Sequence, residues 1–222
     1  MMRRLAIHRY LDPGETLGEV LGGLIMALTF TLGARLFTAT GQLEARELVV
    51  AVVGCNLAWG VIDATLFVLN NLFYRSRHAR FFHALKNTRS EAEALAAVEE
   101  EFGLEDEPLA VHPEDRAHLY RSFVALSARA TPARKGLRRQ DLVAAVIVFV
   151  LVSATAIPGA IPLLLLADAN FALHVSNWIL ILLLFVVGYW WGRYTDAPSW
   201  RVGLTAMLLG VFMVLVAVAL GG

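Results

Sequence analysis

The sequence has one cysteine, Cys55, among its 222 residues, which excludes an intramolecular disulfide framework. Cys55 lies inside an apolar run, where a small buried hydrophobic residue is the simplest interpretation. The chain also lacks a Gly-rich phosphate loop, a nucleophile elbow and a pair of zinc-binding cysteines. We therefore expect no enzyme activity and no covalently bound cofactor.

Charged residues are scarce and lie mostly outside the long apolar runs. They make up 17% of the chain and hydrophobic residues make up 58%, whereas soluble proteins average about 25% and about 45–50%. Most charges lie before Gly18 or between Arg75 and Asp141. This distribution indicates a membrane protein, and the formal net charge of +0 gives no reason to expect a nucleic-acid partner.

Five apolar segments are each about 20–26 residues long, enough to cross roughly 30 Å of hydrocarbon as helices. The predicted fold is all-α: an integral membrane bundle of five transmembrane helices, with a helical cytoplasmic insertion between spans two and three. The chain divides into the tail with spans one and two (1–74), the insertion (75–138), and spans three to five (139–222). The predicted spans are 16–37, 48–73, 141–166, 171–192 and 201–220.

The insertion has the pattern of two soluble helices. Ser90 followed by Glu93 is a capping box before a helix over 91–102, and Pro113 opens a second helix. The basic run 75–89 adjoins a membrane segment, which favours contact with anionic lipid over nucleic acid.

Arginine placement predicts the orientation in the membrane. The N-terminus, the insertion and the turn 193–201 are basic, whereas the loop 38–47 has only Arg46 and the turn 167–170 has no basic residue. The positive-inside rule places the N-terminus and the insertion in the cytoplasm and Gly222 outside, with the chain in the inner (plasma) membrane.

Polar residues recur every seven positions in span two. Asn56, Asp63 and Asn70 fall on one stripe of a helix whose other residues are mostly apolar. An ionisable side chain in lipid costs roughly 2.5–3.5 kcal/mol, so it needs a partner, a water-lined cavity or a proton. Asp63 is therefore a candidate transport residue, and a hydrogen bond to a neighbouring span is the alternative explanation.

Span one begins with two acids, Glu15 and Glu19, which share a helix face. We expect Glu19 and Asp63 to meet at a cytoplasm-facing vestibule, with Glu15 nearby and Asn56 deeper along the path. Their oxygen atoms suit divalent cations such as manganese, and also ferrous iron with some nitrogen or sulfur ligation. For Glu19 the alternative is a side chain that snorkels to the interface.

Three other side chains are candidate metal ligands. Met26 could supply a thioether, although packing is the commoner use of methionine in a membrane helix. Glu99 and Glu100 belong to an acidic cluster of the insertion, which could collect divalent cations or could simply form a solvated helix face.

Span three contains Pro158, Gly159 and Pro162, which predict a broken helix. A broken helix persists at membrane depth only where protein or a water-filled cavity satisfies the backbone. Such a break would permit alternating access to a central site.

Three stretches resemble the vacuolar iron transporter family: 18–22 at the opening of span one, 56–63 in span two, and 158–162 in span three. The resemblance implies five spans with a helical cytoplasmic insertion, and proton antiport of ferrous iron or manganese. It also implies metal binding by the glutamates of the insertion, and a homodimer whose interface includes the glycine row of span one (Gly14, Gly18 and Gly22). The sequence departs from the family pattern where Ile25 and Met26 replace an Asp-Gly pair.

We therefore predict a transporter of divalent metal cations, iron or manganese, that works by proton-coupled antiport. Its expected partners are membrane lipid, protons, the cation and a second copy of the chain. The alternative is a non-transporting membrane scaffold or regulatory protein whose cytoplasmic helices bind a partner.

Overall fold

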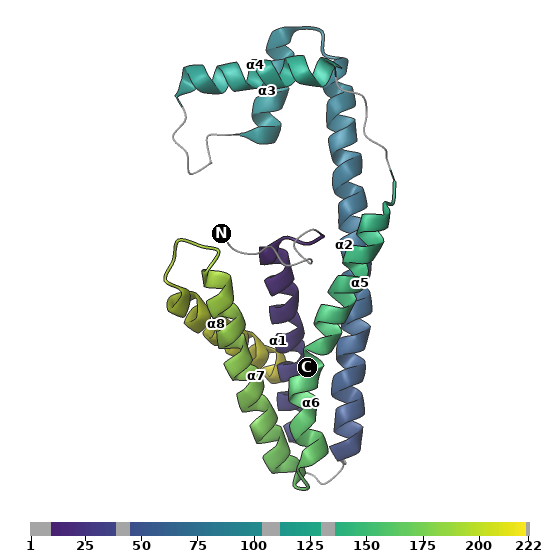
Figure 1. The fold of residues 1–222 in the computed structure, drawn as a ribbon, viewed down its shortest axis with the longest axis vertical. Helices are drawn as coiled ribbons and strands as arrows, with labels where there is room; N and C mark the ends of the chain where they lie inside the picture. The colour runs from purple at the N-terminus through teal and green to yellow at the C-terminus, as the bar shows by residue number, and fades with distance from the viewer. Residues whose placement is uncertain (1–9, 39–44, 104–111, 130–135, 221–222) are drawn as a thin grey trace. The chain divides into compact units, whose positions relative to one another are not determined.

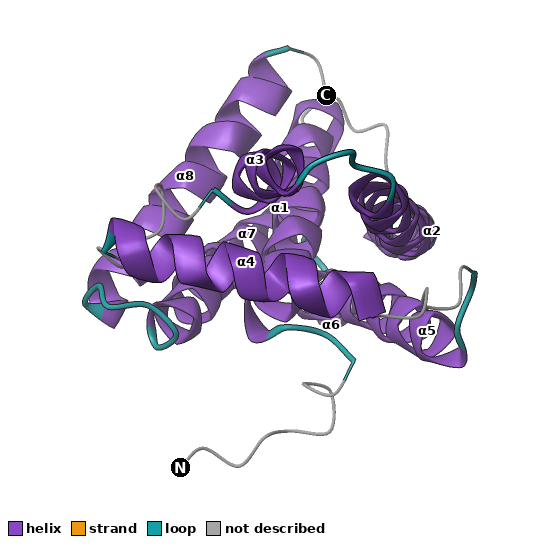
Figure 2. Ribbon diagram, turned by 90° about the horizontal axis from the view of Figure 1, so that it is seen from above, coloured by secondary structure: helices purple, strands orange, loops and turns teal. Residues whose placement is uncertain are grey.

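The computed structural model describes residues 10–38, 45–103, 112–129 and 136–220. Within these ranges the chain forms eight α-helices and no strand (Figure 1; Figure 2). The basic residues of the N-terminal tail that enter the predicted orientation lie outside the described residues. The helices are α1 (Pro13–Thr38), α2 (Ala45–Lys86), α3 (Glu91–Phe102), α4 (Pro113–Arg129), α5 (Arg139–Ala154), α6 (Ala156–Leu165), α7 (Ala169–Gly192) and α8 (Ser199–Ala219).

The helices fall into two compact units. The membrane unit comprises residues 1–68 and 138–222, and the insertion unit comprises residues 69–137. Helix α2 contributes its first part to the membrane unit and its last part to the insertion unit.

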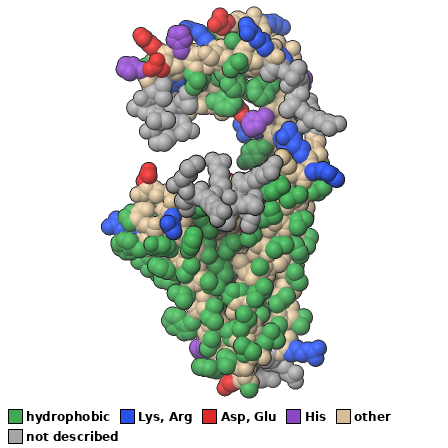
Figure 3. All heavy atoms as spheres, viewed as in Figure 1, with side chains coloured by type: hydrophobic (Ala, Val, Ile, Leu, Met, Phe, Trp, Pro, Cys, Tyr) green, Lys and Arg blue, Asp and Glu red, His purple; other side chains and the backbone are tan. Residues whose placement is uncertain are grey.

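Five helical segments of the described chain are long and apolar enough to cross a membrane, which confirms the predicted all-α bundle of five spans. Large hydrophobic side chains are exposed along α2, α5, α6, α7 and α8, and they cover the face of these helices in Figure 3. Lipid is the solvent that such a surface requires. The segments are Pro13–Ala34, Arg46–Lys86, Arg139–Leu165, Ala169–Gly192 and Ser199–Val216.

Helix α1 is the centre of the membrane unit and packs against α5, α6, α7 and α8. Leu28 of α1 is fully buried, together with Leu173, Leu180 and Leu184 of α7. Helix α2 packs against α5, where Ala64 and other α2 side chains join a smaller cluster around Val148. The central position of α1 places any polar residue on it next to several other helices.

Helices α7 and α8 approach each other through glycines. A Cβ atom added to Gly192 would lie 2.6 Å from the Cα of Ser199, and one added to Gly203 would lie 2.9 Å from the carbonyl oxygen of Phe185. Gly188 faces Gly203 and Ala206 in the same contact. Small residues allow this backbone approach, which is the usual source of helix association in lipid.

The third span is interrupted at Thr155, between the end of α5 and the start of α6. Pro158 has no N–H to donate to the carbonyl of Ala154, and its ring crowds that carbonyl, so α5 ends there. Pro162 lies inside α6. The interruption therefore precedes the predicted segment 158–162, because a proline disturbs the helix four residues before itself.

Side chains cap α1 and α3, and the cap at Ser90 is the predicted one. The Asp12 Oδ1 atom accepts a hydrogen bond of 2.7 Å from the Gly14 N–H at the start of α1. The Ser90 Oγ atom accepts one of 3.2 Å from the Glu93 N–H, and α3 spans the predicted residues 91–102. These contacts satisfy backbone donors that the first turn of a helix leaves free.

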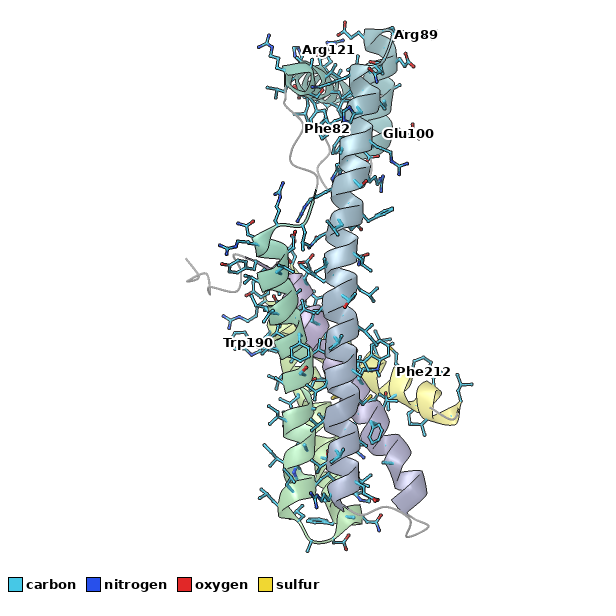
Figure 4. All side chains as sticks on the ribbon, turned by 90° about the vertical axis from the view of Figure 1, so that its right-hand side faces the viewer. Phe82, Arg89, Glu100, Arg121, Trp190 and Phe212 are labelled. Atoms are coloured by element: carbon cyan, nitrogen blue, oxygen red, sulfur yellow. The ribbon has the colours of Figure 1, made fainter. Side chains whose placement is uncertain are left out.

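The insertion unit has a small core of its own between α2, α3 and α4. Leu85, Val98 and Tyr120 are buried there. Aromatic rings, including that of Phe82 (Figure 4), extend this core. The Phe82 and Phe123 rings stack with their centroids 5.9 Å apart. The core is built from large side chains, as expected for two short amphipathic helices packed on a longer one.

Candidate functional site

The two acids predicted to share a site lie on neighbouring helices of the membrane unit. Glu19 is on the second turn of α1 and Asp63 is on α2, and both lie within membrane spans. Both residues are half-buried, and their carboxylates are within range of electrostatic interaction. Neither forms an ion pair with any residue that the structure describes.

Glu15 lies one turn before Glu19 and within its electrostatic range. Its side chain is exposed, and its Oε2 atom accepts a hydrogen bond of 3.3 Å from the Asp12 N–H. Glu15 therefore caps α1 and also adds negative charge beside Glu19. Glu15 and Asp63 are thus both within electrostatic range of Glu19.

Asn56 lies two turns before Asp63 and is fully buried. Its Nδ2 group is 3.0 Å from the carbonyl oxygen of Gly23 and 2.9 Å from the Oγ1 atom of Thr155, and it donates to both. The carbonyl oxygen of Val152 lies 3.4 Å away. One amide thus joins α2 to α1 and to the interruption between α5 and α6.

This junction depends on close backbone contact. A Cβ atom on Gly23 would overlap the Thr155 side chain, and one on Gly60 would lie 2.7 Å from the Oγ atom of Ser153. The buried Oδ1 atom of Asn56 and the buried Oγ atom of Ser153 have no hydrogen-bond partner in the part of the chain that the structure describes. Two uncompensated polar atoms at one helix contact are positions where a water or another ligand would be stabilised.

The three polar residues that recur every seven positions on α2 differ in how deeply they are buried. Asn56 is buried, Asp63 is half-buried and Asn70 is exposed. The stripe therefore leads from the helix junction towards the surface, and the acid lies between its buried and exposed ends.

Met26 is half-buried on α1, two turns after Glu19. Within the described ranges, no group of three or more His, Cys, Asp and Glu side chains is arranged to hold a metal ion. Glu19 and Asp63 would therefore hold a cation together with water or with backbone oxygens, which is common for hard divalent ions.

The acids of the insertion unit have a different setting. Glu101 forms a 3.0 Å ion pair with Arg77, and Glu99 lies 4.0 Å from Arg116. Glu100 is exposed on the surface of α3 (Figure 4). Arginines thus neutralise part of the acidic cluster that contains Glu99 and Glu100.

The glycine row of α1 has two kinds of surroundings. A Cβ atom on Gly18 would reach Trp191 of α7 at 4.0 Å, and Gly14 also faces Trp191. Gly22 has no neighbouring atom within 4 Å of such a Cβ position. Among the glycines of this row, Gly22 is the one with no described atom in front of it, so the helix of another molecule could pack there.

Sequence reasoning missed Thr155, Gly23 and Ser153 as parts of this site. Asn56 gave the only signal, because a buried amide requires partners. The partners come from helices that lie far from Asn56 in the sequence, so no local pattern names them.

The fold defines a multi-pass membrane protein, and the comparison with known families identifies its class. The VIT family model matches residues 70–222. The chain belongs to the VIT (vacuolar iron transporter) family, which is a family of membrane metal-ion transporters and not a class of enzymes.

No curated protein matches the chain at a significant level. The matched region begins after Glu19, Asn56 and Asp63, so the family match covers spans three to five and the insertion. The assignment of roles to these three residues depends on the geometry described above.

Proposed function

We propose that this chain exchanges protons for a divalent metal cation, iron or manganese, with Glu19 and Asp63 as the exchanging carboxylates. The observation that supports the proposal is the proximity of two acids on α1 and α2 within membrane spans, without an ion pair among the described residues. Membership of the VIT family supports the metal ion as the substrate class.

Electrostatics favours this exchange. Two like charges at a site partly shielded from water repel more strongly than in bulk solvent. A divalent cation removes this repulsion, and so does a proton on either carboxyl group. The cation and the protons compete for the same oxygen atoms, which couples the movement of one to the other.

The junction at Asn56 would act as the inner end of the path. Asn56 holds the interruption at Thr155 against α1, and the adjoining Oδ1 and Ser153 Oγ atoms lack partners. The third span is already interrupted at Thr155, and α6 contains Gly159 and Pro162. The angle between α5 and α6 could therefore change without the loss of the backbone hydrogen bonds that a continuous helix would have there.

The remaining parts of the proposal concern assembly and orientation. The insertion and the N-terminus would face the cytoplasm and the C-terminus the outside of the inner membrane. A second copy of the chain would pack at Gly22, which has open space in front of it. The acidic surface around Glu99 and Glu100 would collect cations ahead of the membrane site.

Metal uptake into proteoliposomes tests the role of the two acids. With a pH gradient as the driving force, Asp63→Asn and Glu19→Gln should each lower iron or manganese uptake at least about tenfold, the equivalent of about 1.4 kcal/mol. Both changes preserve side-chain size, so the protein should elute as the wild type does in size-exclusion chromatography.

Glu114→Gln is the matched control, because Glu114 is an exposed acid of α4 in the insertion unit. It should leave uptake unchanged. Wild-type uptake in Asp63→Asn would remove Asp63 from the mechanism. Absence of uptake in the wild-type protein, for every divalent ion tried, would favour the scaffold or regulatory alternative.

A further inference from the structure

Asn177 of α7 is a buried polar residue that the proposed path does not use. Its side chain is 5% exposed and lies in a row with Leu173, Leu180 and Leu184, which are fully buried. Neither its Nδ2 nor its Oδ1 atom has a hydrogen-bond partner among the residues that the structure places. A buried amide without partners is destabilising, so packing does not account for Asn177.

Other buried polar residues of the membrane unit differ from Asn177, because they hold helices together. The Oγ atom of Ser176, the preceding residue, donates a hydrogen bond of 2.8 Å to the carbonyl oxygen of Gly159 in α6. The Asn56 amide donates to α1 and to the interruption of the third span. Such contacts are the usual role of a polar side chain between membrane helices. Asn177 makes none of them with described residues, so its amide is available to a ligand from outside the chain.

Helices α1 and α7 pack against each other (Figure 1). A Cβ atom on Gly18 of α1 would lie 4.0 Å from Trp191 of α7. Further along α1, Ile25 lies 3.5 Å from a Cβ position on Gly210 of α8, and Leu184 of α7 lies 2.9 Å from the same position. Seven residues forward in α1 therefore correspond to seven residues backward in α7, so the two helices run antiparallel.

Thr31 of α1 lies at the level of Asn177 in this pairing. A further step of seven residues leads to Asn177 in α7 and to position 32, next to Thr31, in α1. Thr31 is fully buried, and its Oγ1 atom donates to the carbonyl oxygen of Ala27 at 3.0 Å. A hydroxyl group that donates one hydrogen bond can still accept others. This level of the α1–α7 contact therefore contains two buried polar side chains that can bind a further polar molecule.

The pair lies far from the acids of the proposed path. Thr31 is 12 residues after Glu19, or about 18 Å at about 1.5 Å per residue, in a bilayer whose hydrocarbon core is roughly 30 Å thick. Residues 20–34 of α1 include no charged residue. Neutral amide and hydroxyl groups do not replace the whole hydration shell of a divalent cation, but they bind the water molecules that such an ion keeps.

We propose that Asn177 and Thr31 form a water-binding site in the half of the membrane opposite Glu19, where the hydrated cation enters or leaves the path. The Asn177 Nδ2 group donates to a water oxygen, and the Asn177 Oδ1 and Thr31 Oγ1 atoms accept hydrogen bonds from water. Buried polar groups without protein partners are the usual positions of buried water. Weak, neutral contacts allow an ion to pass without being trapped. The cation part rests on the proposed function, whereas the binding of water does not.

Cysteine labelling of the full-length protein in liposomes tests for water at Asn177. Cys55, the one native cysteine, is first replaced by alanine, and Asn177→Cys is made in that background. A thiol reacts as the thiolate, which forms where water reaches it, so 2-aminoethyl methanethiosulfonate should modify Asn177→Cys at least about tenfold faster than Leu180→Cys. Leu180→Cys is the matched control, because Leu180 is fully buried on the same helix and packs against Gly159. An excess of manganese should slow the labelling of Asn177→Cys, because the hydrated cation and the reagent compete for one site.

Metal uptake by Asn177→Leu tests whether the cation uses this site. Leucine is close to asparagine in size and has no polar side-chain atom, so the variant should melt at or above the wild-type temperature. Its manganese or iron uptake should nevertheless decrease about fivefold, the effect of one lost hydrogen bond to the hydrated ion. Leu180→Cys should keep the uptake of the wild type.

The outcomes separate this site from the proposed exchange at Asp63. Labelling of Asn177→Cys that is no faster than that of Leu180→Cys would overturn the proposal, because the site would be dry. Rapid labelling that manganese does not slow, with wild-type uptake in Asn177→Leu, would overturn the role in the path and leave bound water only. Reduced uptake in Asn177→Leu with unchanged uptake in Asp63→Asn would support this site and overturn the exchange at Asp63. If the wild type took up no metal, rapid labelling would support the water site, and the cation part would fail together with the proposed function.

Discussion

The membrane unit and the insertion unit both contain acidic residues, but the partners of these acids differ between the two units. Glu101 of the insertion unit forms an ion pair with Arg77, whereas Glu19 of the membrane unit is within electrostatic range of Asp63 and has no ion pair among the described residues. The first arrangement is neutral without any ligand. The second places two acids near each other, which is the arrangement on which the proposed exchange of protons and cations depends. The number of acids along the sequence does not distinguish these two arrangements.

The two units also differ in how they pack. The insertion unit is held by large rings such as Phe82 and Phe123, whereas the membrane unit is held by glycines that admit neighbouring backbone, as at Gly23 and Gly188. Burying large apolar side chains stabilises helices in water, but lipid removes that advantage. Close backbone contact and buried hydrogen bonds remain, and both are present at Asn56.

The largest effect should come from metal binding to the purified protein. Manganese or iron at 100 times its Kd should stabilise the wild type by about 2.7 kcal/mol. The pair Glu19→Gln/Asp63→Asn should lose this stabilisation, and Glu99→Gln/Glu100→Gln should lose only a small part of it, because exposed acids hold a cation weakly. Thermal unfolding with and without metal measures both. If only Glu99→Gln/Glu100→Gln lost the stabilisation by metal, the metal site would belong to the insertion unit and not to Glu19 and Asp63.

A smaller effect should separate two adjacent glycines of α1. Gly23→Ala places a methyl group against Thr155 and should lower the free energy of unfolding by about 1–3 kcal/mol. Gly22→Ala is the matched control and should have little effect in the monomer, because its Cβ position is open. Equal destabilisation by both, measured by thermal unfolding, would contradict the packing argument.

The smallest effect should come from the ion pair of the insertion unit. Glu101→Gln removes the partner of Arg77, and the half-exposed position of that arginine limits the cost to about 1 kcal/mol or less. The cost should decrease further in high salt, because salt screens exposed charges. Unfolding measurements at two salt concentrations check this, and a loss of several kcal/mol would show that the pair is essential to this unit.

Much of the fold follows from local patterns. The five spans were predicted from apolar length, and the cap at Ser90 from Glu93 three residues later. The position of the break in the third span was less accurate. The sequence analysis placed it at 158–162, whereas the structure places it at Thr155, because the disturbance by Pro158 acts four residues earlier.

The candidate site was predictable only in part. Glu19 and Asp63 could be named because a charged group in an apolar run is costly, and the structure places them within interaction range. Thr155 and Gly23 could not be named, since both are common residues of membrane helices. Their roles depend on contact with Asn56, which lies 33 residues from Gly23 and 99 from Thr155.

By itself, the sequence determined which segments are helical, which of them can cross a bilayer, and which polar residues would need a partner there. These properties depend on hydropathy and on interactions within one or two helical turns. Only the tertiary structure decided that Asn56 joins α2 to α1 and to the interruption at Thr155, and which acids lie within electrostatic range of one another. Such pairings depend on helix packing, where shape and backbone clearance select among partners that local sequence cannot distinguish.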